Sequence, residues 1–426
     1  MALYTEEAAA AGGDWGIRGV GLLEADRRMA DVLGRQDRLY TVVERDGDGS
    51  QARVVGSIVD FALVAGDEAA FAAHVADPDV AIVSLTITEA GYSLTTRNPT
   101  IEALVAGLDA RRAAGGRPIT VLSCDNLQRN GDTARAAATA VAQARSVDLA
   151  RYVEEACTFP NSMVDRITPQ TTDEDRTWLR DEIGIDDGWP VVCEPFRQWV
   201  VEDRFAAGRP SWEDVGVLFS DRVHDWEQYK LRMLNASHSC MAYPMALAHV
   251  VHVDEAMAVP VVRRYLEQLL GAEVIPTLVE IPGHPAVEYA DTVLRRYENT
   301  GVRDTIGRLC ADGTAKFPNV LVPTVEAQLE RGGPVSCAAL ALAAWSRYLA
   351  TVPAGDRAVD TRGERAAQLA SRALADPLAF LELDEVFTAP VRNAKSFRDA
   401  FAAASRDLAE HGPIEAIERV LDRDVS

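Results

Sequence analysis

The stretch Val80–Thr86 has the sequence VAIVSLT, an almost continuous apolar run that is rich in β-branched residues. This composition is typical of a parallel strand that is buried on both faces. A predicted helix, Thr100–Ala114, separates it from a second run of the same kind, Ile119–Ser123, with the sequence ITVLS. Strands that alternate with helices indicate an α/β domain built on a parallel sheet.

The residues before this stretch continue the alternation. We predict a helix over Leu3–Ala10, a strand over Trp15–Leu22 and a helix over Asp67–Val75. Two strand-like segments, Leu39–Glu44 and Arg53–Phe61, flank a turn with the sequence DGDG. The first half of the chain is therefore predicted to form one α/β domain.

The glycines of Gly19-Val20-Gly21 resemble the start of a dinucleotide-binding fingerprint, but the third glycine is missing and the pair lies inside the predicted strand. We interpret this segment as the end of the second strand of a dinucleotide-binding unit, where an acidic residue meets the adenosine ribose. Asp26 and its neighbour Glu24 are the candidates for that contact. A carboxylate there favours NAD over NADP, although Arg27 and Arg28 are near enough in sequence to reach a 2′-phosphate.

Open parallel sheets bind ligands beyond the carboxyl ends of their strands. The first buried run is followed by Thr86, Thr88 and Glu89, and the second by Asp125 and Asn126. Thr86, Thr88 and Glu89 are therefore candidates for cofactor contacts, and Asp125 and Asn126 are candidates for part of a ligand site.

The strand pattern fades from about Trp212 onward, and Ala, Leu and Arg dominate to the end of the chain. We place a domain boundary near 205–212, at the turn Gly208-Arg209-Pro210. The predicted organisation is an α/β domain of residues 1–208, incomplete at its start, and a mainly helical domain of residues 209–426.

Lysine is rare in this chain. Only three of the 43 basic residues are lysines, namely Lys230, Lys316 and Lys395. A lysine can lose its proton near neutral pH, whereas an arginine cannot. A lysine in so arginine-rich a chain is therefore a candidate for acid–base chemistry.

Lys230 lies in Asp225–Tyr243, DWEQYKLRMLNASHSCMAY, which is predicted to be helical. At about 100° per residue, polar side chains interrupt an apolar stripe within one arc of about 140°. These side chains are Glu227, Lys230, Asn235 and His238. Buried polar groups cost free energy unless they are paired or used. The pattern alone leaves two interpretations open, an acid–base set or a solvated helix face with an incidental histidine.

The composition argues against several classes of function. The net charge of −22 disfavours nucleic acid and anionic membranes as partners, because both attract basic surfaces. No HxxxH, HExxH or CxxC spacing occurs, so a zinc site has no support. The six widely spaced cysteines indicate reduced thiols in a cytoplasmic protein, and residues 1–13 do not resemble a signal peptide. Cys337–Ala350 is predicted to be a buried helix rather than a membrane span.

Six motifs occur in the order in which one known family carries them: GDWGI from Gly13, SLTITE from Ser84, SCDN from Ser123, FPNSMVDRITP from Phe159, CEPF from Cys193 and KLRMLNASH from Lys230. On these motifs the chain resembles the polyol-specific long-chain dehydrogenases of the mannitol 2-dehydrogenase family, which also contains the fructuronate and tagaturonate reductases. The resemblance covers residues 13 to 325. It implies a Rossmann-like first domain that binds NAD.

The resemblance implies metal-independent hydride transfer between NAD and a polyol or ketose. Lys230 matches the catalytic base, and Glu227 matches a carboxylate on the proton path to solvent. Asn126 and Asn235 match the two amides that hold the reacting oxygen. Substrate contacts are implied for Val164, Asp165, His238, Arg308 and Lys316. From the residues alone, Asp165 is equally compatible with a structural ion pair to Arg166, and Arg308 with a solvated helix position.

Elementary chemistry agrees with the lysine role. Oxidation of a secondary alcohol requires removal of the hydroxyl proton as hydride leaves carbon. A free lysine has a pKa of about 10.4, so burial beside amides and a cationic nicotinamide would have to lower it. Two amide donors would stabilise the alkoxide-like oxygen as an oxyanion hole does.

The chain departs from the family at its start. Family members carry a first strand and a Gly-rich turn ahead of GDWG, whereas Met1 already lies in the predicted helix that follows. Such a turn holds pyrophosphate on backbone N–H groups, so we expect weak NAD binding and exposed strand edges. The expected explanation is a start assigned about 30 to 50 codons too late. The segment after Gly91-Tyr92 is also shorter than is usual in the family.

Three functions remain open on the sequence. The leading one is a mannitol-type polyol dehydrogenase, and the second is a fructuronate or tagaturonate reductase, for which Arg197 would bind the carboxylate. The third is a catalytically impaired, N-terminally truncated homologue. The expected partner is a small polyol or ketose, with the chain as a monomer or weak homo-oligomer.

Overall fold

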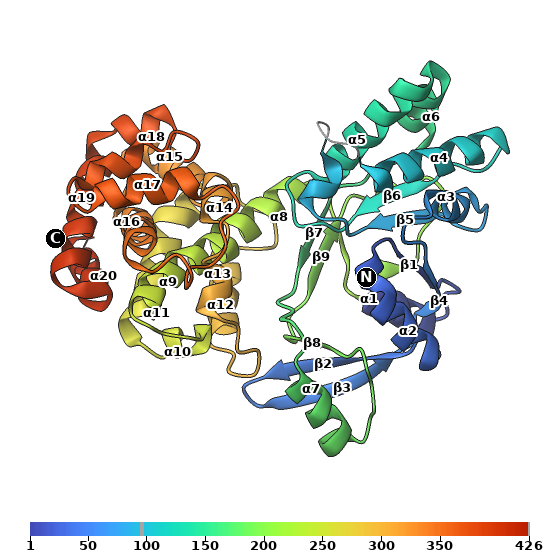
Figure 1. Ribbon diagram of the computed structural model, residues 1–426, viewed down its shortest axis with the longest axis horizontal. Helices are drawn as coiled ribbons and strands as arrows, with labels where there is room; N and C mark the ends of the chain where they lie inside the picture. The colour runs from blue at the N-terminus through green and yellow to red at the C-terminus, as the bar shows by residue number, and fades with distance from the viewer. Residues whose placement is uncertain (94–97, 425–426) are drawn as a thin grey trace. The chain divides into compact units, whose positions relative to one another are not determined.

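The computed structural model describes residues 1–93 and 98–424 and divides into two compact units, Met1–Trp226 and Glu227–Ser426 (Figure 1). Residues 94–97, in the short segment after Gly91-Tyr92, lie outside the described residues. The division comes later than the boundary expected near 205–212. Trp212 packs on Trp199 with ring centroids 4.8 Å apart, and β10 (Leu218–Phe219) pairs with β9 (Gln198–Val201), so both segments stay with the first unit.

The first unit is an α/β unit whose strands form separate small sheets over the described residues. β1 (Ile17–Gly21) pairs in parallel with β4 (Ile58–Leu63), and β5 (Ile82–Leu85) pairs in parallel with β6 (Thr120–Ser123). Two three-stranded sheets have the orders β3-β2-β8 and β10-β9-β7. Their remaining bounds are Tyr40–Asp46 for β2, Gly49–Val55 for β3, Ser162–Asp165 for β7 and Val191–Cys193 for β8.

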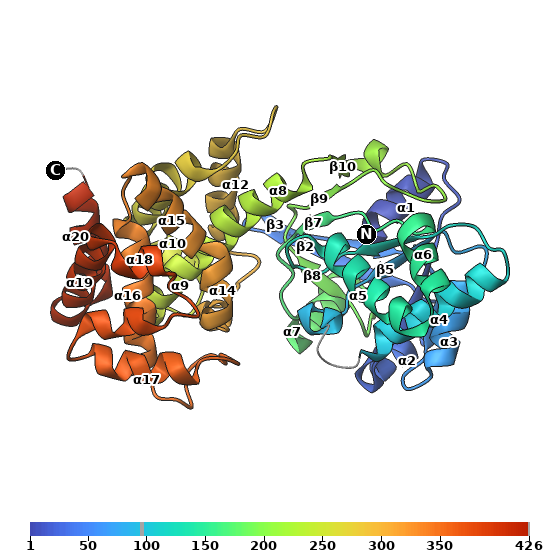
Figure 2. The same cartoon turned by 90° about the horizontal axis from the view of Figure 1, so that it is seen from above.

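Helices cover the pair formed by β5 and β6. α3 to α6 lie side by side next to these strands (Figures 1 and 2). Asp67 caps α3 by accepting from the amide of Ala70 at 2.9 Å, and Asn98 caps α4 ahead of Pro99. The helices of this unit are α1 Ala2–Ala10, α2 Arg27–Arg35, α3 Glu68–Ala76, α4 Pro99–Ala113, α5 Asn130–Arg145, α6 Val147–Ala156 and α7 Asp173–Trp178. The predicted alternation of helices and parallel strands is confirmed.

One predicted strand is in fact two. The segment Arg53–Phe61 is interrupted at Gly56-Ser57, where the amide of Gly56 binds the carboxylate of Glu6 at 2.8 Å. β3 pairs back onto β2, whereas β4 turns away to pair with β1. The carboxylate of Glu6 in α1 thus accepts the backbone N–H of Gly56, where the chain passes from the sheet of β3 to that of β4.

A cavity of about 840 Å³ lies alongside β1 and β5. Apolar side chains supply much of its lining, including Val20, Phe71, Val75, Ile82 and Leu85. Each of the two strands pairs on one side only within the described residues.

The second unit is mainly helical, and its described residues contain no β-strand. Its core is α16 (Ser336–Thr351), which confirms the buried helix predicted over Cys337–Ala350. Its Trp345 belongs to a cluster of aromatic rings whose other members include Tyr243, Phe317, Phe380, Phe387, Phe397 and Phe401. The other helices are α9 Ala236–Leu247, α10 Val253–Met257, α11 Pro260–Gln268, α12 Ala286–Tyr297, α13 Ile306–Leu309, α14 Gly313–Val320, α15 Val322–Arg331, α17 Glu364–Ala373, α18 Ala389–Asn393, α19 Lys395–Glu410 and α20 Gly412–Asp424.

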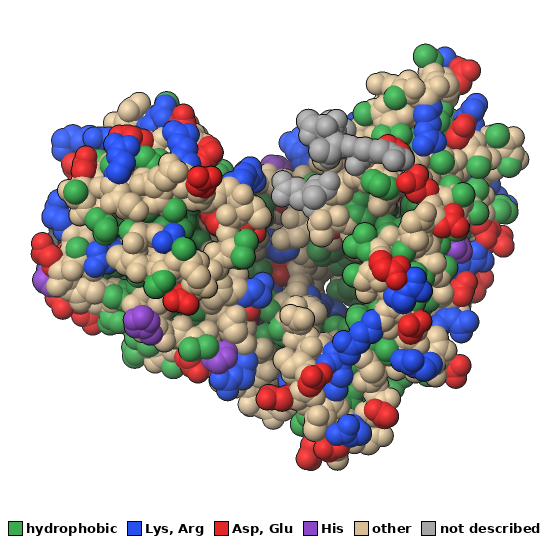
Figure 3. Space-filling view, viewed as in Figure 1, with side chains coloured by type: hydrophobic (Ala, Val, Ile, Leu, Met, Phe, Trp, Pro, Cys, Tyr) green, Lys and Arg blue, Asp and Glu red, His purple; other side chains and the backbone are tan. Residues whose placement is uncertain are grey.

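The surface mixes charges of both signs. On the face drawn in Figure 3, acidic and basic side chains are interspersed. Within the described residues, none of the helices has the length and apolar character needed to span a bilayer.

Candidate active site

The end of β1 presents Asp26 to the cavity of the first unit. Its carboxylate accepts the amide of Leu23 at 2.9 Å, which fixes the short turn after the strand. A Cβ on Gly21 would lie 2.9 Å from the Cβ of Asp26, so the glycine leaves room for this side chain to close over the strand end. Asp26 thus lies at the carboxyl end of a parallel strand, where the sequence placed it.

The neighbours of Asp26 are already engaged. The carboxylate of Glu24 pairs with the guanidinium of Arg27, and Arg28 lies over the ring of Trp189 at 5.9 Å from its centroid. Glu24 is exposed and does not line the cavity. Of the two predicted ribose contacts, the structure therefore brings Asp26 and not Glu24 to the cavity.

The ends of β5 and β6 are tied together by Asp125. Its carboxylate accepts the amides of Ile87 and Thr88 at 3.0 and 2.8 Å and the hydroxyl of Tyr92 at 2.5 Å. Thr88 has a positive φ of 61°, a conformation that these bonds hold in place. Thr86 is exposed and lines the same cavity as Asp26. The side chain of Glu89, the third predicted cofactor contact here, lies outside the described part of the structure.

Asn126 directly follows Asp125 and is exposed, whereas Asp165 is only 4% exposed at the end of β7. Val164 and Asp165 pair with Trp199 and Gln198 of β9. The guanidinium of Arg166 donates to the carboxylate of Glu44 and to the carbonyl of Glu194.

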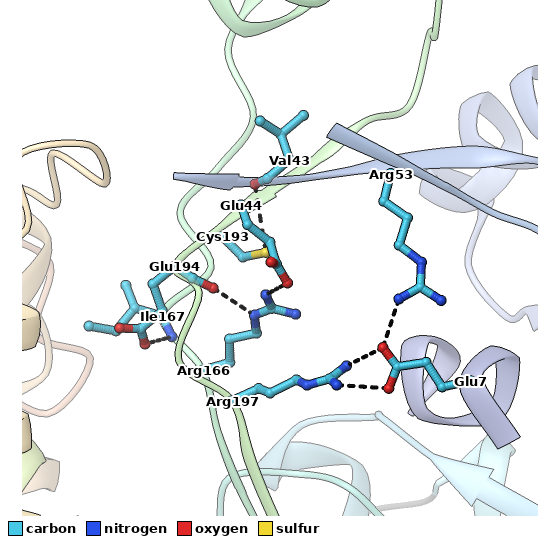
Figure 4. A network of polar contacts seen from close by, with 9 residues as sticks. All are labelled: Glu7, Val43, Glu44, Arg53, Arg166, Ile167, Cys193, Glu194 and Arg197. Carbon is cyan, nitrogen blue, oxygen red and sulfur yellow. Dashed lines mark hydrogen bonds and ion pairs between the residues drawn. The ribbon is translucent and has the colours of Figure 1, made fainter. Parts of the chain in front are cut away.

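Arg197 is held inside the first unit. Its two terminal nitrogens donate to both carboxylate oxygens of Glu7 at 3.1 and 2.7 Å (Figure 4). Its guanidinium also lies 4.6 Å from the ring centroid of Tyr4. Burial acts to raise the pKa of Glu7, but the bonds from Arg197 and Arg53 outweigh it and lower that pKa. Arg197 therefore joins α1 to the segment before β9.

In the second unit, Lys230 lies within a helix that runs from α8 (Val223–Tyr229) into α9. This helix passes Pro244, where the predicted stretch ended, and residues Lys230–Asn235 form a π turn rather than an α-helical one. Glu227 and Lys230 are 4% and 8% exposed, and Asn235 is half-buried. The alternative of a solvated helix face is therefore wrong for these residues.

His238 packs against a tyrosine. Its ring stacks on Tyr297 of α12 with centroids 4.2 Å apart. The hydroxyl of Tyr297 donates to the carbonyl of Leu234 at 2.6 Å and lies 2.8 Å from the hydroxyl of Ser237. Tyr297 thereby contacts both the π turn and Ser237, the second residue after it.

Arg308 and Lys316 lie close enough to influence one another. Both nitrogens of the Arg308 fork donate to the buried carboxylate of Asp304, with Nε at 2.7 Å. Burial acts to raise the pKa of Asp304, but the bonds and charge of Arg308, with a further contribution from His238, lower it below its usual value. Burial lowers the pKa of Lys316, and the charge of Arg308 lowers it further. Asp304, which was not predicted, thus lies near both Arg308 and His238, and Arg308 in turn lies near Lys316.

The two units correspond to two domains of one protein family. Residues 2–214 match the Rossmann domain of mannitol dehydrogenases, and residues 222–409 match the mannitol dehydrogenase C-terminal domain. The chain belongs to the mannitol dehydrogenase family.

Relatives in this family resemble the chain over most of its length. Mannitol 2-dehydrogenase of Phaeosphaeria nodorum is 40% identical over 92% of this chain and 74% of its own. Mannitol 2-dehydrogenase of Aspergillus oryzae is 37% identical over 99% of this chain and 90% of its own.

Two solved structures share the fold. Pseudomonas fluorescens mannitol 2-dehydrogenase, solved as a ternary complex with NAD and D-mannitol, matches with a TM-score of 0.88 and 37% identity over 99% of this chain and 91% of that one. A D-sorbitol dehydrogenase in substrate-free form matches with a TM-score of 0.88 and 34% identity over 98% of this chain and 91% of that one. The first domain is therefore Rossmann-like, and the second is mainly helical.

The residues of the first domain fit the ribose end of NAD. Asp26 and Thr86 follow the carboxyl ends of β1 and β5 and line the cavity that lies alongside these strands. Doubly wound folds bind dinucleotides at the carboxyl ends of their strands. A cavity of about 840 Å³ is within the usual size of a ligand site. The described residues contain no group of three or more His, Cys, Asp or Glu side chains that could hold a metal ion.

The sequence pattern did not indicate Asp304 or Tyr297, and it did not predict the hydrogen bonds of Asp125. The bond pattern of Asp125 had no sequence signal beyond its place after a buried strand. The pair Asp304 and Arg308 has the i, i+4 spacing of a helical ion pair and could have been found from it. Tyr297 gave no signal, because its partner is a backbone carbonyl more than 60 residues away in sequence.

Proposed function

We propose that this chain oxidises a mannitol-type polyol to a ketose, and reduces the ketose, with Lys230 as the acid–base residue. As a member of its family the chain is an NAD-dependent polyol dehydrogenase. The observation that carries the finer proposal is the burial of Lys230 in the same helix as Glu227 and Asn235, because burying polar groups in a helix costs free energy unless they are used. The solved relative that contains NAD and D-mannitol supports the substrate class.

Each residue has one task in the proposed reaction. NAD supplies the hydride acceptor in the oxidative direction. Lys230 removes the hydroxyl proton as the hydride leaves, and Glu227 passes that proton towards solvent. The amides of Asn126 and Asn235 donate to the oxygen as negative charge develops on it, where preorganised donors are most effective. In the reductive direction Lys230 returns the proton.

The other polar side chains bind substrate hydroxyls. Asp165 is an acceptor, whereas Arg308 and protonated Lys316 are donors. His238 can do either, and Val164 supplies an apolar contact. Asp304 fixes the direction of the Arg308 fork, since both ends of its carboxylate are occupied by that guanidinium.

The proposed reaction needs no metal ion. The lysine and the two amides replace the Lewis acid that zinc dehydrogenases use, so prolonged EDTA treatment leaves the rate unchanged. Loss of activity on chelation that zinc restores would contradict the lysine mechanism.

The hexuronate alternative loses its main support. Arg197, the residue expected to bind a uronate carboxylate, has both terminal nitrogens bound to Glu7. A panel of mannitol, arabinitol, sorbitol and fructuronate with NAD(H) tests the proposal, and we expect turnover of a polyol and not of fructuronate. Turnover of fructuronate alone would establish the reductase, and turnover of none would support an impaired homologue.

A further inference from the structure

The helix that carries Lys230 changes its pitch where the chemistry is proposed. An α-helix places residue i+5 about 140° around its axis from residue i, so Lys230 and Asn235 would diverge. In a π turn the hydrogen bond runs between residues i and i+5, which makes these two residues successive neighbours on one face. In this helix the structure has a π turn over Lys230–Asn235. The turn therefore aligns the proposed base with one of its proposed amides.

A π turn is rare and needs support from outside the helix. The hydroxyl of Ser237 reaches back to the carbonyls of Met233 and Leu234, at 3.2 Å from the latter. The hydroxyl of Tyr297 donates to the same carbonyl of Leu234 at 2.6 Å. Both side chains are at most 1% exposed, so these bonds form away from water. Removing a donor there leaves a buried carbonyl short of a partner.

Tyr297 acts on the site in a second way. Its ring stacks on the imidazole of His238 with an interplanar angle of 28°. The hydroxyl thus holds the π turn, while the ring orients a proposed substrate contact three residues beyond it. The two effects can be separated, because phenylalanine keeps the ring and removes the hydroxyl.

We propose that Tyr297 is a positioning residue: its hydroxyl, bound to the Leu234 carbonyl, holds the π turn that sets Lys230 and Asn235 on one face. This inference rests on the proposed role of Lys230. Tyr297 itself takes no part in proton or hydride transfer: its hydroxyl acts through the geometry of the turn, and its ring acts through His238.

The test is the variant Tyr297→Phe. We expect kcat for polyol oxidation to fall about tenfold, which corresponds to the upper range of one buried hydrogen bond. KM for the polyol should change less than about twofold, because the stack on His238 remains. NADH affinity, titrated by fluorescence, should be unchanged.

A matched control is Tyr265→Phe. Tyr265 is also fully buried in the second domain, and its hydroxyl also donates to a backbone carbonyl, that of Cys337 at 2.8 Å. This variant should lower the melting temperature as much as Tyr297→Phe does, with kcat unchanged. Equal loss of kcat in both variants would mean that Tyr297 is merely structural.

A double-mutant cycle separates this inference from the function on which it rests. In a Lys230→Ala background, Tyr297→Phe should not lower kcat any further, because the lysine side chain that Tyr297 positions is already absent. Near-wild-type turnover in Lys230→Ala would overturn the proposed function. A nearly inactive Lys230→Ala variant beside a fully active Tyr297→Phe variant would overturn only the role of Tyr297.

Discussion

The two domains differ in how tightly their interiors are packed. The second is built around α16, whose residues Leu340, Leu342 and Trp345 are completely buried. The first has its parallel strands divided into separate pairs over the described residues, with a cavity of about 840 Å³ beside them. A close-packed interior transmits and resists strain, whereas an open one leaves strand edges and apolar side chains without contacts. The difference suggests a division of labour, with rigid support for the lysine in one domain and space for a cofactor in the other.

The largest effect is expected from Lys230→Ala. If the second domain carries the acid–base chemistry, turnover should fall by about 10²- to 10⁴-fold, the usual contribution of general acid–base catalysis. NADH binding should remain, because the variant leaves the first domain untouched. Steady-state kinetics and fluorescence titration measure the two properties separately, and added primary amines should restore part of the rate.

Lys395→Ala is the matched control for this variant. Lys395 is exposed and pairs with Asp399 one turn later, so its loss should be nearly neutral. A comparable loss of turnover in both lysine variants would break the proposed division of labour.

Much of the fold was predictable because it depends on local pattern. The apolar runs Val80–Thr86 and Ile119–Ser123 contain β5 and β6, which pair in parallel as expected. The run Cys337–Ala350 is the core helix of the second domain. The period of the hydrophobic residues and the length of the apolar run predict whether such an element is a strand or a helix, and both can be read from the sequence.

The site was predictable only in its residue types. The rarity of lysine indicated Lys230 as a candidate acid–base residue, and the position of Asp26 after β1 indicated a contact with the ribose. The π turn was not predictable, because bonds from Tyr297 on a distant helix help to support it. Nor was the engagement of Arg197 by Glu7, since a guanidinium that binds a protein carboxylate and one that binds a substrate carboxylate look alike in sequence.

A second prediction compares the two interiors directly. Leu340→Ala removes a fully buried side chain from α16 and should lower the free energy of unfolding by about 2–5 kcal/mol. Leu22→Ala removes the same atoms beside the cavity, where the side chain is only partly buried, and should cost about 1 kcal/mol or less.

Thermal unfolding followed by circular dichroism distinguishes these variants, with the two domains treated as separate transitions because two-state behaviour is not expected of a two-domain chain. Equal destabilisation by both substitutions would show that the first domain is packed as tightly as the second.

The smallest effect is expected at the cofactor end of the first domain, from Asp26→Asn. The amide oxygen can still accept from Leu23, so the turn after β1 is kept while the negative charge is lost. That charge favours the ribose 2′-hydroxyl of NAD and repels the 2′-phosphate of NADP, so the ratio of kcat/KM for NAD over NADP should fall about tenfold, or about 1.4 kcal/mol. Glu24→Gln is the control: it releases Arg27 without changing the cavity, and it should raise the use of NADP less than Asp26→Asn does. Turnover at saturating NAD should be nearly normal in both variants, because the proposed acid–base residue, Lys230, lies in the other domain. An unchanged cofactor ratio in Asp26→Asn would place the ribose elsewhere, and the cavity beside β1 and β5 would then need another occupant.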